Sequence, residues 1–212
     1  SPNTDQTKVN LGLNSRFQLS RRLSFDVNIN YVKLNNDNLP QQGNSMRNPL
    51  LEFNSWYGRQ VNTQSLYDTY EDIIIYEGKE MAYNWMMGYD DQHPNPYWNA
   101  YKNTMSRSRN RMFGNVAITY EIMDGLNLMG RLGTDFFNEN RRFIFHKYSR
   151  DWTEMYKNAT NGNLWEQYRL ESETNADLLL TLDRDLGENL SLFATLGGNY
   201  RMAFDQYATT SG

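Results

Sequence analysis

The sequence predicts an all-β fold, a segment of an antiparallel transmembrane β-barrel. Three observations favour this fold: six stretches in which apolar and polar residues alternate, connections that are short and long in turn, and aromatic residues near the ends of the apolar stretches. A barrel strand turns alternate side chains toward lipid and lumen, so alternation over about ten residues is its expected pattern. We therefore expect about six membrane-spanning strands in this chain.

The six alternating stretches lie at residues 9–19, 23–31, 112–122, 126–136, 170–182 and 190–201. In each, apolar side chains occupy one face of the predicted strand and mostly polar side chains the other. Four large apolar residues fall on the polar side, namely Phe113, Met129, Leu179 and Phe193. The apolar faces are formed by Val9, Leu11, Leu13, Phe17, Leu19, Leu23, Phe25, Val27, Ile29, Tyr31, Met112, Val116, Ile118, Tyr120, Ile122, Leu126, Leu128, Leu132, Phe136, Leu170, Ala176, Leu178, Leu180, Leu182, Leu190, Leu192, Ala194, Leu196 and Tyr200.

The connections sort the strands into three hairpins, at about residues 7–32, 109–137 and 169–202. Short turns close each hairpin, and the turn at 123–125 contains the Asp-Gly pair that is common in tight β-turns. Residues 33–107 and 138–168 form connections far longer than those of a compact domain. We expect short periplasmic turns at one rim and long extracellular loops at the other, since a soluble meander has no reason to sort its loops by edge.

A barrel of this kind needs more strands than this chain supplies. An unpaired strand in hydrocarbon leaves its backbone amides unsatisfied, and only a closed ladder removes that cost. The smallest known barrels have about eight strands, so we interpret residues 1–212 as one part of a longer barrel domain. The missing initiator Met and signal peptide fit this interpretation, with the targeting information expected upstream.

Composition excludes several functions. The formal charge of −4, without a long run of one sign, argues against nucleic-acid binding. The absence of Cys removes thiol catalysis and thiolate metal sites. The acidic residues are spread over several strands without a partnered His, and His93 and His146 lie in separate loops. We therefore expect no catalytic activity, no metal and no cofactor.

The segment 95–142 resembles the SusC/RagA family of TonB-dependent outer-membrane transporters of Bacteroidetes. It carries the motif Asn95-Pro96-Tyr97-Trp98, then an Arg- and Asn-rich approach at 107–111, a strand with a short turn, and Gly130-Arg131-x-Gly133. The flanking hairpins look like the same barrel region. The resemblance implies a roughly 22-stranded barrel filled by a plug, in the bacterial outer membrane. It also implies import of glycan or peptide fragments beneath a SusD-like lipoprotein, driven by TonB.

We find no TonB-box segment and no plug domain in this sequence, so we expect TonB to act through a missing N-terminal segment. The loop at 33–107 is rich in aromatic rings with polar edges, which suit contacts to sugars or peptides. The candidate substrate-binding residues in this loop are Trp56, Tyr57, Trp85, Tyr89, Tyr97 and Trp98. The same rings could instead form a small core within the loop, with Pro96 fixing a turn and Trp98 packed inward.

Three further expectations follow from the pattern. Helical spacing of apolar residues suggests a helix at about 65–80, although the β-branched run 73–75 disfavours it. The charged residues expected to face the lumen should be hydrated or pair with the plug; they are Arg16, Asp26, Glu121, Arg131, Asp135, Glu171, Glu173, Asp177 and Arg201. Two other functions stay open: a soluble or surface-exposed carbohydrate-binding β-domain, and an outer-membrane barrel enzyme.

Overall fold

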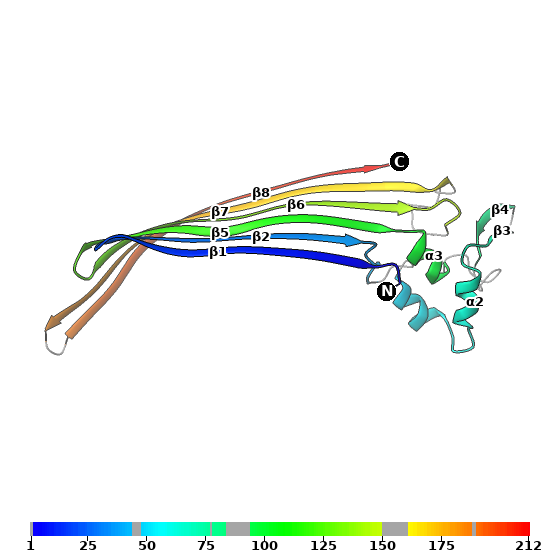
Figure 1. Ribbon diagram of the computed structural model, residues 1–212, viewed down its shortest axis with the longest axis horizontal. Coiled ribbons are helices and arrows are strands. Elements are labelled where there is room, and N and C mark those ends of the chain that lie inside the picture. The colour runs from blue at the N-terminus through cyan, green and yellow to red at the C-terminus, as the bar shows by residue number, and fades with distance from the viewer. Residues whose placement is uncertain (1, 44–47, 77, 84–93, 150–160, 188–189) are drawn as a thin grey trace.

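The computed structural model describes residues 2–43, 48–76, 78–83, 94–149, 161–187 and 190–212. Its main body is one antiparallel six-stranded sheet in the order β1-β2-β5-β6-β7-β8, which confirms the predicted fold class; the sheet is open, with β1 and β8 at its edges. The strands are β1 (Asp5–Ser20), β2 (Leu23–Asp37), β5 (Met105–Met123), β6 (Leu126–Phe145), β7 (Asn163–Gly187) and β8 (Leu190–Ser211). Figure 1 shows a long, curved sheet with its tight turns at one end and small helices gathered at the other.

The pairing register merges the six alternating patterns into two continuous faces. Directly paired residues lie on the same face of a sheet, and one such row across the sheet contains Val27, Val116, Leu132, Ala176 and Tyr200. We call this the apolar face. The next row on the opposite side contains Asp26, Ala117, Arg131, Asp177 and Asn199, and we call this side the polar face.

No described segment covers the apolar face. Its large side chains are exposed across the whole sheet, for example Leu11 at 63%, Leu132 at 56% and Leu196 at 74%. A soluble protein rarely leaves a contiguous apolar surface of this extent open to water. The sheet therefore lacks the second layer that a β-sandwich would place here.

Every strand extends beyond its predicted apolar stretch at the end that carries the long connections. β2 continues to Asp37, β6 continues to Phe145 and β7 begins at Asn163, so the connections are shorter than the sequence indicated. In β2, β5 and the first added part of β6, the added residues on the apolar-face side are polar, and they include Lys33, Asn35, Asn110, Asn138 and Asn140. In β8, Met202 and Phe204 continue the apolar face. The alternation of hydrophobicity thus ends earlier in β2 and β5 than the backbone pairing does.

The tight turn between β5 and β6 depends on Gly125. This residue has a φ of +80°, a conformation that glycine adopts readily and other residues rarely adopt. A Cβ at this position would also lie 2.2 Å from the carbonyl oxygen of Asp183 on β7. The Gly125 oxygen in turn accepts a hydrogen bond of 2.7 Å from the Asp183 amide. The turn thus packs directly against the neighbouring strand.

The connection between β2 and β5 folds into a small unit at the end of the sheet, which we call the outer module. It contains α1 (Pro49–Leu51), the π-helix η1 (Glu52–Trp56), α2 (Thr63–Asp68), a hairpin of β3 (Ile73–Tyr76) and β4 (Lys79–Ala82), and α3 (Pro96–Tyr101). The helix expected at 65–80 is therefore correct only over 65–68 and wrong from residue 69 onward. The β-branched run 73–75 loses side-chain freedom in a helix and pairs instead with β4.

Among the described residues, no helix is long and apolar enough to span a membrane.

Candidate functional site

The Asn95-Pro96-Tyr97-Trp98 motif forms the start of helix α3. The Asn95 side chain accepts a hydrogen bond of 3.0 Å from the Tyr97 amide, and its own amide donates to the Leu66 carbonyl at 2.9 Å. Pro96 occupies the first turn, where a missing N–H leaves no bond unmade. The motif therefore begins a helix and joins it to α2, whereas the sequence suggested only a turn at Pro96.

Trp98 anchors α3 to the connection between β6 and β7. Its side chain is 2% exposed, and its indole Nε1 donates a hydrogen bond of 2.7 Å to Ser149 Oγ. The Ser149 hydroxyl donates to Asn103 Oδ1 at 2.7 Å. The His146 ring packs edge-on against the indole, with 5.3 Å between the two ring centroids. These contacts hold the outer module and the second long connection together at one rim.

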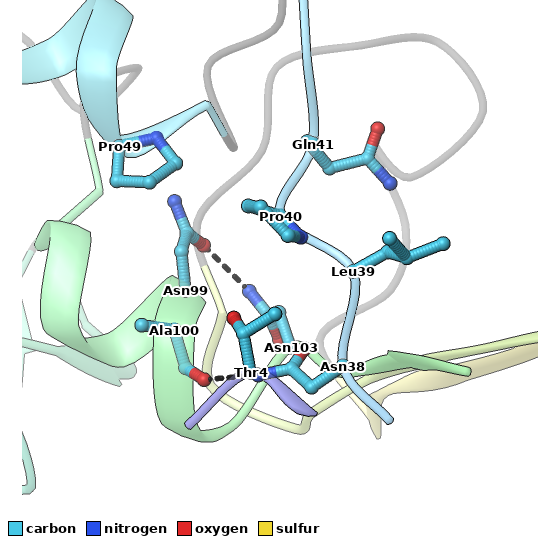
Figure 2. Close-up of a pocket in the computed structure, with 9 residues that line it drawn as sticks. All are labelled: Thr4, Asn38, Leu39, Pro40, Gln41, Pro49, Asn99, Ala100 and Asn103. Atoms are coloured by element: carbon cyan, nitrogen blue, oxygen red, sulfur yellow. Dashed lines mark hydrogen bonds between the residues drawn. The ribbon is translucent and has the colours of Figure 1, made fainter. Parts of the chain in front are cut away.

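Hydrogen bonds of Asn38, Asn99 and Asn103 connect α3 to the start of the outer module, as Figure 2 shows. Asn103 donates to Asn99 Oδ1 at 2.8 Å, and Asn38 donates to the Ala100 carbonyl at 2.6 Å. The cavity between these residues, Pro40 and Pro49 has a volume of about 10 Å³, which is about one water molecule. It is a structural gap, too small for cargo.

The structure separates the predicted substrate-binding residues into three groups. Tyr57 and Trp98 are buried, and the Tyr57 hydroxyl donates to the Pro94 carbonyl at 3.1 Å. Trp56 is 46% exposed at the end of η1, and Tyr97 is half-buried. Trp85 and Tyr89 lie outside the described residues.

Tyr97 belongs to a row of aromatic rings on the outer module, which we call the ring row. Its centroid lies 5.3 Å from that of Tyr67 and 6.2 Å from that of Phe53, both in edge-to-face contact. The row comprises Tyr57, Phe53, Tyr97, Tyr67, Tyr70 and Tyr101. The candidate set derived from the sequence contains only Tyr57 and Tyr97 of these. The spacing of Phe53 and Tyr57, and of Tyr97 and Tyr101, by four residues was an available helical signal.

The ion pair between Lys102 and Glu71 lies beside Tyr70, at one end of the ring row. Lys102 Nζ lies 5.9 Å from the centroid of the Tyr70 ring and donates a hydrogen bond of 2.5 Å to Glu71 Oε1. This hydrogen bond, together with the positive charge of Lys102, lowers the pKa of the Glu71 carboxyl. The outer module thus presents aromatic surface beside a paired, exposed charge.

The polar face of the sheet carries ion pairs that run from strand to strand. Arg16 pairs with Asp26 at 2.5 Å, Arg131 with Asp177 at 2.6 Å and Arg201 with Glu173 at 2.6 Å. The sequence predicted that these charges would be hydrated or would pair with a plug, but they neutralise one another across adjacent strands. Sequence alone did not predict this because the register between strands decides which charges meet.

A denser cluster lies toward the outer end of the same face, around Glu139. This side chain is 3% exposed and accepts hydrogen bonds of 2.6 Å from both Arg107 and Arg141, one at each carboxylate oxygen. Arg109 Nε lies 3.6 Å from the same carboxylate, and its guanidinium stacks 3.9 Å from the centroid of the Phe137 ring. Three guanidinium groups therefore surround one carboxylate.

Within the described ranges, no group of three His, Cys, Asp or Glu residues could hold a metal ion. On the polar face, Asp177 and Glu173 each pair with an arginine of a neighbouring strand.

Comparison with known proteins shows that this chain is similar in fold to a part of other solved structures. No family model matches the chain, and no curated protein matches it. Among solved structures, it is similar to a chain of the RagAB peptide importer in the "closed-closed" state, with a TM-score of 0.67 and 14% sequence identity. The match covers 98% of this chain and 21% of that one; the "open-open" state gives a TM-score of 0.65 with the same identity and coverage. The chain thus has the fold of about one fifth of that importer chain.

Proposed function

We propose that this chain is part of the barrel wall and outer loops of an outer-membrane nutrient importer of the SusC/RagA type. In this proposal the polar face lines the lumen, the apolar face meets outer-membrane lipid, and the outer module lies outside the cell. Energy would come from TonB through a segment beyond this chain. The cargo would be a glycan or peptide fragment, delivered together with a SusD-like surface lipoprotein, without a chemical step.

The observation that carries the proposal is the uncovered apolar face. It crosses all six strands in register, and the opposite face is polar and ion-paired. A membrane barrel needs this division because one face is solvated by acyl chains and the other by water or protein. A soluble carbohydrate-binding domain would need a second layer of polypeptide over Leu132 and Leu196, which are more than half exposed.

Within the outer module we assign different roles to the candidate residues. Trp56 and Tyr97 have exposed ring surface and would contact cargo by stacking, together with Trp85 and Tyr89. Tyr57 and Trp98 are buried and would position the ring row. The exposed part of the ring row around Tyr67, which is 45% exposed, would offer amphipathic contact area to the lipoprotein or the cargo.

The test is uptake by cells that produce the intact protein. We expect the protein in the outer-membrane fraction, and we expect accumulation of labelled peptide or oligosaccharide to require both TonB and the partner lipoprotein. Trp56→Ala should weaken cargo binding, while Phe193→Ala, an exposed ring near the opposite rim, should leave it unchanged. Recovery of the protein in the soluble fraction, or uptake that is unaffected by loss of TonB, would refute the proposal.

A further inference from the structure

Positive charge collects on the polar face near the outer end of β1, β2 and β5. One row of the register places Lys8 beside Leu34, Leu34 beside Arg109, and Arg109 beside Glu139. Along β5, Arg107 and Arg111 flank Arg109 at every second residue, on the same face. The polar-face positions of residues 5–10, 32–37 and 105–111 include these four cations and no acid.

Arg109 differs from the other arginines of this cluster in its bonding. Both oxygens of Glu139 are already engaged by Arg107 and Arg141, and Arg111 donates to Asp135 at 2.8 Å. Arg109 Nε is buried and has no hydrogen-bond partner among the described residues. A buried donor without a partner destabilises the structure, and a charged donor does so more than a neutral one. The Arg109 side chain as a whole is 29% exposed, so a ligand on the polar face can reach part of it.

An open cavity lies directly beside Arg109. Its volume is about 240 Å³, and it is lined by Arg109, Arg111, Asp135, Phe137, Glu171 and Glu173. The three acids are already held: Asp135 by Arg111, Glu171 by Arg169 at 2.7 Å, and Glu173 by Arg201 at 2.6 Å. The cavity is many times larger than the gap of about 10 Å³ beside Asn103, which has the volume of about one water, so it can accept a group the size of an amino-acid side chain.

We propose that Arg109 binds a carboxylate group of the cargo at this cavity. The inference rests on the importer function proposed above and specifies the chemistry of its cargo. The planar guanidinium matches a carboxylate in geometry, and its stacking on Phe137 holds it in place. A dianionic phosphate fits less well because the three acids of the cavity repel a second negative charge. The same acids suit N–H or O–H donors next to the bound carboxylate.

The experiment compares cargo before and after its carboxylates are neutralised. A peptide digest and an oligogalacturonate mixture are each methyl-esterified, and binding of the free and esterified forms to the purified intact importer is measured. We expect the free form of one of the two mixtures to bind about 10- to 100-fold more tightly than its ester, the effect of one hydrogen bond to a charged group. Which mixture shows the difference identifies the source of the carboxylate.

Arg109→Gln should abolish this difference and leave binding of the ester unchanged. Arg131→Gln is the matched control, because it removes the same charge from the same face at an arginine that Asp177 already holds; it should keep the preference. Equal binding of free and esterified forms by the unaltered importer, or a preference that survives Arg109→Gln, would overturn the carboxylate site. Either result leaves the importer proposal standing, since that proposal is tested by the membrane location of the protein and by uptake, and not by the preference for free carboxylates.

Discussion

Replacing Leu132 with lysine tests directly whether water or lipid surrounds the apolar face. Leu132 lies in the middle of the apolar face, paired with Val116 on β5 and Ala176 on β7, and it is 56% exposed. In water, replacing so exposed a leucine with lysine changes the free energy of unfolding by no more than about 0.5 kcal/mol. In a bilayer, a lysine on the lipid face near the midplane destabilises a barrel by about 2–4 kcal/mol.

The control is Asn115→Lys, one residue before Val116 and therefore at nearly the same depth on the polar face. We expect Leu132→Lys to lower the free energy of unfolding of the intact protein by about 2–4 kcal/mol in phospholipid vesicles. Asn115→Lys should change it by less than about 1 kcal/mol, since its side chain does not enter lipid. Reversible guanidinium unfolding followed by tryptophan fluorescence measures both.

Equal effects of the two substitutions, each below about 0.5 kcal/mol, would show that the apolar face does not contact acyl chains. The importer proposal would then lose the observation on which it depends. A large loss in both variants would instead locate the perturbation in strand pairing, because both positions share one region of the β5–β6 ladder.

Trp98→Phe should keep the packing of α3 and remove the hydrogen bond to Ser149, so we expect hydrogen exchange at the amides of residues 97–101 to become about five-fold faster, the effect of about 1 kcal/mol; unchanged exchange there would contradict the anchoring role. The Glu71 carboxyl has a pKa lowered by Lys102, so its stabilising contribution is present above the ordinary glutamate pKa of about 4.3 and is lost as the pH falls through the lower folded value. Lys102→Met should return the Glu71 titration, measured by NMR, toward that ordinary value.

The sequence predicted the inner parts of the six strands because a strand with one apolar and one polar face alternates along its length. Val27, Val116 and Leu132 could be assigned to one face from parity alone. The outer ends could not, since Lys33 and Asn35 are polar on a face that is apolar below them, and only backbone pairing continues the strand there. Local signals also misled at 73–75, where helical spacing competed with β-branched side chains.

The site was less predictable than the fold because it depends on contacts between distant segments. The inward packing of Trp98 was one of two open alternatives, and its partner Ser149 lies 51 residues away. Arg109 did not stand out in the sequence from Arg107 and Arg111. Only the register that places it beside Glu139, with both carboxylate oxygens occupied, distinguishes it from the other two.

The ladder of ion pairs also serves to align the strands. A slip of two residues between neighbouring strands keeps every apolar side chain on its own face, so the division into two faces alone does not exclude that slip. Such a slip between β6 and β7 would move Arg131 from opposite Asp177 to opposite Asn175 or Leu179. The ion pairs of the polar face thus select one alignment among those that keep the two faces separate.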